Sequence, residues 1–382
     1  MVAFWLVIGL TNCPKAKTAV PESLFSQLGV QPVATVASDC TEPTDFVFSP
    51  DGRRVVYTGW LREDADPKVG VWVNDTFLMR TDSVFELGFN EAGIPYFVGS
   101  DSGKAYVYYR FARPRAYERV GSPSFSRDGR NYACLVTNGG RQSLVVGDGS
   151  TRTFGNVYSF ALNPVGEEFA YAGRDSVDWF VVDGSDTSDI YDEVGSMAYS
   201  PDGAHLAYAA EADGNWLVVL DGDEFDPFPD DVIDISDVTL SGKGDHMAYV
   251  VTAEDSATGK LYEYPVIDEQ EGDAHQDITG LRFSPDGSKL AYAAADGDGQ
   301  FAVDDYVADP EYDEVWGLTY GADNVRLAYV ARDGDEEFIV ANGREHEVHE
   351  SVDRVIFNRS GSRVGYGVLD GRQFSWVVED AN

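Results

Sequence analysis

The stretch that decides the fold is Leu281-Arg282-Phe283-Ser284-Pro285-Asp286-Gly287-Ser288-Lys289-Leu290-Ala291-Tyr292. Leu281 and Phe283 alternate with other residues, as one face of a β-strand requires, and Leu290 and Tyr292 resume the alternation after a break. The break is Ser-Pro-Asp-Gly, in which proline presets φ, aspartate bonds its own backbone and glycine takes a positive φ at little cost. The stretch therefore predicts two strands joined by a tight turn.

Close copies of this stretch recur along the chain at intervals of 36 to 43 residues. Aligned on the turn glycine or its replacement, the nine anchors are Gly52, Gly93, Gly129, Gly166, Gly203, Gly244, Gly287, Asn324 and Gly361. A large apolar or aromatic residue stands four positions before every anchor, and tyrosine stands five positions after seven of the nine. We expect these two positions to pack between neighbouring units.

The second half of each copy carries a further apolar run, such as Trp179-Phe180-Val181-Val182. A more polar segment follows, such as Tyr191-Asp192-Glu193-Val194 or Tyr312-Asp313-Glu314-Val315, which we interpret as a fourth strand. Four short strands in such a unit match the size of a propeller blade. The predicted fold is all-β: a single β-propeller of four-stranded blades over residues 33–382.

With its Phe-Ser-Pro-Asp-Gly turns, the chain resembles the WD40-like bacterial propellers of the PD40, TolB-type family, whose blades also occur in prolyl oligopeptidases. The resemblance covers roughly residues 44–382 and implies a repeat fold that serves scaffolds, receptors and enzyme lids alike. Neither a hydrolase Gly-x-Ser-x-Gly motif nor a separate amino-terminal α/β domain like that of TolB is evident. The resemblance therefore implies the fold and leaves the activity open.

The number of blades has two interpretations. Nine anchors favour nine blades, whereas propellers typically have four to eight, so eight blades with one irregular repeat outside the ring is the alternative. The last repeat ends too soon for a fourth strand, and Val33-Ala34-Thr35-Val36-Ala37 could supply it. Such a strand would cover the edge that an open ring exposes.

The amino terminus suggests an address outside the cytoplasm. Residues 1–13 combine a short apolar run with Leu10-Thr11-Asn12-Cys13, which resembles a bacterial lipobox with Cys13 as the lipidated residue. Asparagine before the cysteine and the absence of a preceding basic residue depart from that pattern, and an apolar tail or uncleaved anchor is the alternative. Residues 14–32 read as a linker with a short helical turn around Ser23 to Leu28. Cys40 and Cys134 are predicted to be buried thiols rather than a disulfide or a zinc site.

Charge is the clearest departure from a plain scaffold. The chain has a formal net charge of −38, from 66 acidic and 28 basic residues. Residues 1–160 contain 16 of each kind, so a neutral arc would face a strongly acidic one. Such a ring could orient a basic partner, whereas adaptation to high salt predicts acidity without a partner. Nucleic-acid binding is disfavoured because phosphates would be repelled.

Candidate site residues fall in two groups. An unusual loop mixes aromatic and proline residues with acids and is a candidate partner loop: Phe225, Pro227, Phe228 and Pro229. A local basic patch lies in the neutral arc: Arg110, Arg113, Arg115 and Arg119. No catalytic residue, cofactor or metal is predicted, and the five histidines are interpreted mainly as strand residues. Calcium is kept as a weak alternative for Asp221-Gly222-Asp223-Glu224 and Asp296-Gly297-Asp298-Gly299, which we expect to be turns.

These observations predict a monomeric, non-enzymatic, extracytoplasmic propeller, in the periplasm or at the cell surface, that binds a basic or envelope-associated protein. Its contact with a membrane would be through a lipid on Cys13 only. The alternative function is an enzyme, or a receptor for a small ligand or metal, with its site in the central channel. A salt-adapted repeat protein that only assembles with itself is a third hypothesis.

Overall fold

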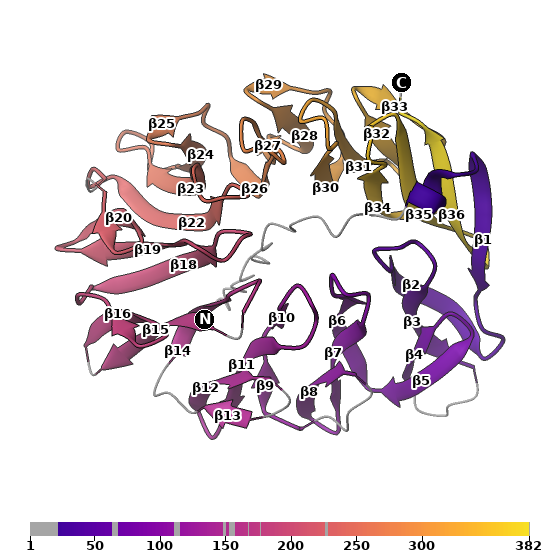
Figure 1. The fold of residues 1–382 in the computed structure, drawn as a ribbon, viewed down its shortest axis with the longest axis horizontal. Coiled ribbons are helices and arrows are strands. Elements are labelled where there is room, and N and C mark those ends of the chain that lie inside the picture. Colours follow the sequence, from indigo (N-terminus) through magenta and orange to yellow (C-terminus); the bar gives the residue numbers. More distant parts are fainter. Residues whose placement is uncertain are drawn as a thin grey trace.

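Nine β-sheets stand around a common centre in the computed structural model, which describes residues 22–62, 68–110, 115–147, 150–152, 157–166, 168–175, 177–225 and 228–381 (Figure 1). Neighbouring strands in the sheets run antiparallel. The chain is thus an all-β, single nine-bladed propeller of mostly four-stranded sheets, and the preferred blade number is confirmed.

The blades are numbered 1 to 9 in chain order. The innermost strands, in that order, are β2 (Cys40–Phe48), β6 (Ser83–Phe89), β10 (Ser124–Phe125), β14 (Val157–Leu162), β18 (Glu193–Tyr199), β22 (Val232–Leu240), β26 (Asp277–Phe283), β30 (Glu314–Tyr320) and β34 (Ser351–Phe357). The second strands are β3 (Val55–Leu61), β7 (Pro95–Asp101), β11 (Tyr132–Asn138), β15 (Phe169–Asp175), β19 (Leu206–Ala212), β23 (Met247–Glu254), β27 (Leu290–Asp296), β31 (Leu327–Asp333) and β35 (Arg363–Asp370).

The third strands are β4 (Val69–Val73), β8 (Lys104–Tyr109), β12 (Arg141–Val146), β16 (Asp178–Asp183), β20 (Asn215–Leu220), β24 (Leu261–Ile267), β28 (Gly299–Asp304), β32 (Glu336–Ala341) and β36 (Gln373–Asp380). The outermost strands are β5 (Thr76–Thr81), β13 (Ser150–Arg152), β17 (Asp186–Thr187), β21 (Asp223–Glu224), β25 (Gln270–Glu271), β29 (Val307–Ala308), β33 (Arg344–Glu345) and, in blade 9, β1 (Gly29–Thr35). Blade 2 has three strands within the described residues, and β9 (Arg119–Val120) pairs with β11 in blade 3.

The predicted position of the fourth strand was wrong. Tyr191 makes only an isolated bridge to Trp179, and Tyr312 makes the same bridge to Gln300. The outermost strands β17 and β29 come earlier, directly after a tight hairpin turn, as at Gly184 with φ 57°. The segments assigned to a fourth strand instead lead into β18 and β30, the innermost strands of the following blades.

The amino-terminal strand completes blade 9, because β1 pairs with β36 (Figure 1). β1 starts at Gly29, so part of the segment assigned to the linker belongs to the ring. Pro32 does not prevent this pairing, since the strand lies at a sheet edge and its register shifts between Pro32 and Ala34. The short helix η1 (Glu22–Phe25) precedes β1, and the Phe25 side chain is buried.

The anchor turns explain why neighbouring blades fit closely. Eight anchors have positive φ, Asn324 among them, and Gly166 is the exception. Several anchors also lie against a side chain of the preceding blade: a Cβ on Gly244 would lie 2.4 Å from the His205 ring, and a Cβ on Gly52 2.7 Å from Trp376. Glycine at these anchors therefore serves both the turn and the packing.

The core lies between the blades, as predicted. The seven repeat tyrosines are all buried: Tyr57, Tyr171, Tyr208, Tyr249, Tyr292, Tyr329 and Tyr366. Cys134 takes the same place in blade 3 and is a buried free thiol, whose pKa burial raises to about 12. Cys40 is likewise free and buried. Packing on both faces of each sheet makes the ring a rigid frame for its loops.

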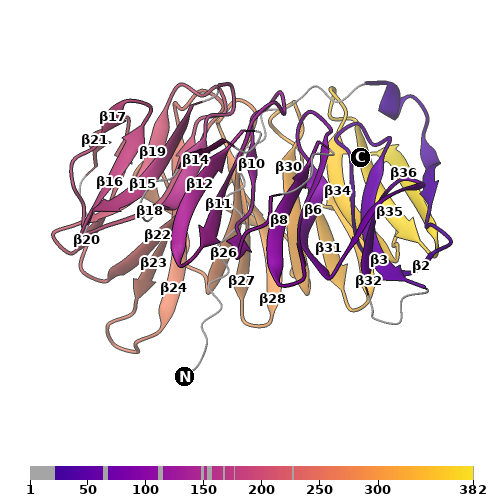
Figure 2. The same ribbon diagram turned by 90° about the horizontal axis from the view of Figure 1, so that it is seen from below.

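Loops project from two faces of the ring, seen edge-on in Figure 2. One face, here called the anchor face, carries the anchor turns and the hairpin turns between third and outermost strands. The opposite face carries the turns between second and third strands, among which the β23–β24 hairpin projects furthest in that view (Figure 2). Its loop is ordered by Asp255, which accepts hydrogen bonds from Thr258 N at 2.7 Å and Ala257 N at 3.0 Å. No helix in the described residues is long and apolar enough to cross a membrane.

Candidate functional site

Acidic side chains at one position of the repeat have a structural role in five of the described blades. Eleven residues before an anchor, an acidic side chain accepts a hydrogen bond from the backbone of its own blade's second hairpin turn. The pairs are Asp82 with Ser102 N, Glu118 with Gly139 N, Asp192 with Gly214 N, Asp313 with Gly334 N and Glu350 with Gly371 N, at 2.7 to 3.3 Å. These carboxylates satisfy turn N–H groups and need no partner molecule to explain them.

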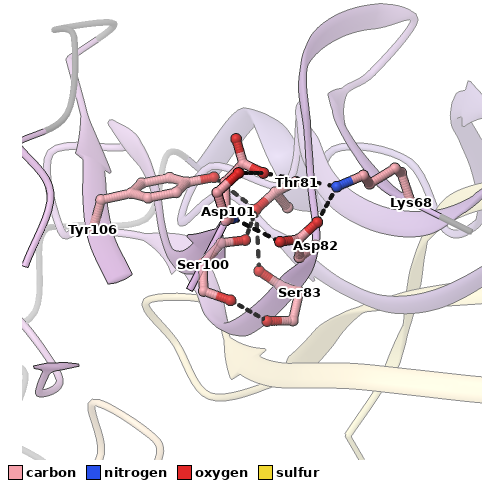
Figure 3. Close-up of polar contacts among 8 residues, drawn as sticks. Lys68, Thr81, Asp82, Ser83, Ser100, Asp101 and Tyr106 are labelled. Carbon is pink, nitrogen blue, oxygen red and sulfur yellow. Dashed lines mark hydrogen bonds and ion pairs between the residues drawn. The ribbon is translucent and has the colours of Figure 1, made fainter. Parts of the chain in front are cut away.

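The junction of blades 1 and 2 contains the polar network drawn in Figure 3. Lys68 forms an ion pair with Asp82 and lies 3.7 Å from Asp101. The Tyr106 hydroxyl donates to Thr81 Oγ1 at 2.7 Å, and Thr81 in turn donates to the Ser100 carbonyl. The hydrogen bond from Lys68 lowers the pKa of Asp82, while burial raises the pKa of Tyr106. The donors and acceptors of the network are satisfied by one another, so we interpret its role as structural: it holds the two blades together.

The innermost strands border the centre of the ring (Figure 1). One position of the repeat near these strands, seven residues before each anchor, is mostly polar, and we call the nine residues there the inner level: Asp45, Glu86, Ser122, Ser159, Ser196, Asp237, Gly280, Gly317 and Arg354. Several reach the next blade, since Ser159 Oγ donates to Gly195 O at 2.9 Å and Ser196 Oγ accepts from Val238 N at 3.2 Å. This level stitches one innermost strand to the next.

Three of the four charged members of the inner level, Asp45, Glu86 and Arg354, lie in blades 1, 2 and 9, and the fourth, Asp237, lies in blade 6. Burial raises the pKa of Asp45 and of Glu86, and Glu86 accepts a hydrogen bond from Tyr96 at 3.0 Å. The Arg354 Nε lies 3.5 Å from an Asp353 oxygen that also accepts from the Phe48 N–H. Two under-solvated carboxylates and an arginine make this the place where a channel site would be sought. The channel hypothesis stays a prediction.

Metal-ligand geometry is not found in the described residues: no three His, Cys, Asp or Glu side chains come together in a way that could hold an ion. The two Asp-Gly-Asp segments considered for calcium lie at hairpin turns, between β20 and β21 and between β27 and β28.

All five histidines hold a carboxylate through Nδ1. The pairs are His205 with Asp221, His246 with Asp268, His275 with Asp296, His346 with Glu379 and His349 with Asp370, at 2.6 to 2.9 Å. The hydrogen bonds that Asp221 and Asp268 accept raise the pKa of His205 and of His246. The side chains of His346 and His349 are buried, neither residue lies in a strand, and both act as packing residues rather than alternating strand positions.

The hairpins between third and outermost strands carry two kinds of acid in blades 4 to 7. One kind is structural: Asp221 accepts from Leu206 N, Asp268 accepts from Met247 N, both at 3.0 Å, and Asp304 accepts from the Tyr320 hydroxyl at 2.5 Å. In blade 1 the same work is done by an amide, since Asn74 accepts from Val55 N at 2.9 Å. The bond therefore needs an oxygen at this position but not a charge.

Acids of the second kind accept no such structural hydrogen bond from a described residue. Asp186, Asp223, Glu269 and Glu271 are exposed and make no side-chain hydrogen bond or ion pair with a described residue. They follow one another along the outer rim of the anchor face, which we call the acidic rim. The five blades 4 to 8, residues 157–349, hold 45 acidic and 8 basic residues. In contrast, residues 101–147 hold 3 acidic and 8 basic residues.

The predicted partner loop lies beside this rim. Phe225 and Phe228 are half-buried and pack on the core shared by blades 5 and 6, and their N–H groups donate to Val218 O and Trp216 O. Pro229 is exposed, whereas Pro227 lies outside the described residues. The aromatic side chains thus anchor the loop, and partner binding by it stays a prediction.

Three of the four arginines of the predicted basic patch lie within the described residues, and the patch itself stays a prediction. Arg110 donates to the Gly129 carbonyl and lies over the Tyr109 ring, and Arg115 and Arg119 are exposed near the start of blade 3. Arg113 and Cys13 lie outside the described residues.

A family model supports the repeat type. Residues 269–301, which include the first and second strands of blade 7 and the start of its third, match the WD domain, G-beta repeat. This chain is a β-propeller with a WD40-type repeat. No curated protein matches it. Similar solved structures include the Dos1 propeller (8% identity, TM-score 0.44, covering 91% of this chain and 95% of that one) and a eukaryotic initiation factor (12% identity, TM-score 0.43, covering 91% and 90%). A structure from a study of two prolyl endopeptidases is 12% identical with TM-score 0.44 and covers 76% of this chain and 55% of its own.

Proposed function

We propose that this propeller is a non-enzymatic interaction module whose acidic blades orient a basic protein partner. The observation that supports it is the separation of charge around a rigid ring: 45 acidic against 8 basic residues in blades 4 to 8, next to a segment, residues 101–147, in which basic residues are in excess. Adaptation to high salt would make every blade acidic. A partner that must approach in one orientation selects a one-sided field.

The exposed carboxylates of the acidic rim are the charges that an approaching partner would meet first. Its carboxylates stand on short hairpins held by the structural acids, so they keep their positions without being needed for the fold. Exposed charges of this kind act mainly on the association rate and on its salt dependence, since water and ions screen them within about 10 Å. The mechanism is therefore long-range orientation followed by contacts of loops on the anchor face.

The test combines partner capture with neutral variants. The chain from residue 14 is used as bait at about 50 mM and about 500 mM salt, bracketing the range over which screening changes most. The triple variant Asp223→Asn, Glu269→Gln, Glu271→Gln should slow association with the captured partner several-fold at low salt and flatten its salt dependence. The matched control, Asp39→Asn, Glu42→Gln, Asp75→Asn, removes three exposed acids from the neutral arc and should bind as the unmodified chain does. Equal loss in both variants would refute the role of the rim.

The location is part of the same proposal. Residues 1–13 support an extracytoplasmic, lipid-anchored monomer with an envelope-associated partner, and the resemblance to TolB-type propellers points the same way. Labelled palmitate should enter the unmodified chain and not Cys13→Ser in a bacterial host. Labelling that is equal in both forms, or absent from both, would remove the lipid from the proposal.

A further inference from the structure

The hairpins between third and outermost strands share one form in blades 5 to 8, with two residues at the tip. Both tip residues have positive φ, and glycine is the preferred residue at the second of them. Blades 5 and 8 follow this preference, with Gly222 at φ 88° and Gly343 at φ 71°. Blades 6 and 7 instead have Glu269 at φ 67° and Tyr306 at φ 69°. An acid and an aromatic side chain are thus kept at two neighbouring tips where glycine would suit the turn better.

The side chains at these two tips lie outside the core. Tyr306 is 48% exposed, and Val307, the first residue of β29, is 67% exposed. In blade 6, Glu269 and Glu271 of the acidic rim are exposed and form no ion pair with a described residue. Blades 6 and 7 are neighbours in the ring, and both hairpins lie on the anchor face (Figure 1). The two tips therefore present an aromatic face, an apolar side chain and two carboxylates to an approaching partner.

The chemistry of the tips favours arginine over lysine. A guanidinium stacks on an aromatic ring through its plane and binds a carboxylate through two parallel N–H groups, whereas an ammonium group is a point charge. The methylene groups of arginine also cover exposed apolar surface such as Val307. A lysine of the same blade does not occupy this place, because Lys289 lies 3.8 Å from Asp304 and 4.0 Å from Asp305, both acids of its own blade.

We propose that these two tips are the docking point for an extended, arginine-rich segment of the basic partner, with one guanidinium on Tyr306 and another on Glu269 or Glu271. An extended chain advances about 3.3 Å per residue, so different arginines of one segment reach the two tips. Docking here rests on the function proposed above, because it needs the same basic partner, and it adds the chemistry of the contact.

The test uses the full chain and a short capped peptide of alternating glycine and arginine with a benzophenone photocrosslinker at its centre, at about 50 mM salt. Crosslinks should concentrate on residues 268–271 and 305–308, and the equally charged lysine peptide should prefer these residues less strongly. Tyr306→Leu keeps the apolar size and the backbone φ but removes the aromatic face. The peptide concentration for half-maximal crosslinking at the tips should therefore rise about two- to fivefold, the effect of an exposed cation–π contact.

Two variants serve as matched controls. Tyr306→Phe keeps the aromatic face and should keep the half-maximal concentration of the unmodified chain. Phe77→Leu should keep it as well, because it removes an aromatic side chain that is 44% exposed beside the equivalent hairpin of blade 1, in the neutral arc.

Two results would overturn the docking point: crosslinks spread evenly over blades 4 to 8, or the same half-maximal concentration for Tyr306→Leu and the unmodified chain. Either result would leave the one-sided charge field of the proposed function in place. Absence of any crosslink at low salt would refute both the docking point and the attraction of a basic partner.

Discussion

Gly52→Ala should be among the most damaging single-methyl substitutions in this ring. The residue has φ 62°, which costs an L-residue other than glycine about 1–2 kcal/mol. A Cβ there would lie 2.7, 2.9 and 3.0 Å from three ring atoms of Trp376, which is 1% exposed and cannot move aside without disturbing the pairing of β1 with β36. Overpacking of this kind costs about 1–3 kcal/mol, and the less flexible unfolded chain returns about 0.4–1 kcal/mol, so the net loss should be roughly 1–5 kcal/mol.

The chain offers a matched control at another anchor. Gly166 does not have positive φ, and the nearest atom to an added Cβ is 3.7 Å away. Gly166→Ala should therefore be neutral or stabilising by up to about 1 kcal/mol. Urea unfolding followed by tryptophan fluorescence measures both variants against the unmodified chain. The reasoning fails if the two variants shift the midpoint equally, or if Gly52→Ala leaves it unchanged.

Three further outcomes are expected. Burial and the neighbouring Asp277 raise the pKa of Asp237, so ionisation of this carboxyl destabilises the folded state as pH rises toward and through the folded-state pKa. Asp237→Asn removes that charge, and asparagine tolerates the backbone φ of 49° at this position. The variant should therefore have a higher urea midpoint than the unmodified chain at pH 7 and lose that advantage below about pH 4. Asp221 raises the pKa of His205, so the ion pair stabilises the folded state below about pH 6.5, and this contribution is lost as pH rises through the raised pKa. The difference in unfolding free energy between the unmodified chain and His205→Asn should therefore shrink from pH 6 to pH 9. The change should be less than about 1 kcal/mol because the pair is exposed. Deleting residues 22–35 should lower the free energy of unfolding by about 3 kcal/mol or more, since it uncovers Trp376 and Phe374; a midpoint close to that of the full chain would show that β1 is dispensable.

The ring itself could be predicted because its signals are local and repeated nine times. The Ser-Pro-Asp-Gly turn sets positive φ at the anchors, and the tyrosine five residues later is buried in every blade that has it. The outermost strands could not be placed in the same way, because two-residue strands such as β17 carry no periodicity. The segment Tyr191-Asp192-Glu193-Val194 was predicted to be a strand, but Tyr191 is a buried packing residue in the connection between one blade and the next.

The histidines show a signal that was available in the repeat. His275 and His349 stand twelve residues before an anchor, where other blades have Tyr117, Tyr191 and Tyr312, and each makes the same isolated bridge. Alignment of that position would have assigned both to packing. The start of β1 at Gly29 could not be anticipated, because residues 14–32 read as a linker and the pairing with β36 joins segments that are far apart in the sequence.

The pairing of β1 with β36 has a consequence for synthesis on the ribosome. The two strands lie at opposite ends of the ring's sequence, so β1 emerges first and its partner is completed last. At about 5–20 residues per second, roughly 17–70 s pass between the two events. During that interval the two ends of the growing array are not joined. Val30, which remains exposed even in the finished ring, then lies on an unpaired strand, directly after the exposed Leu28. Pro32 has no N–H group, so β1 lacks one of the donors that another chain's strand would need in order to pair with it.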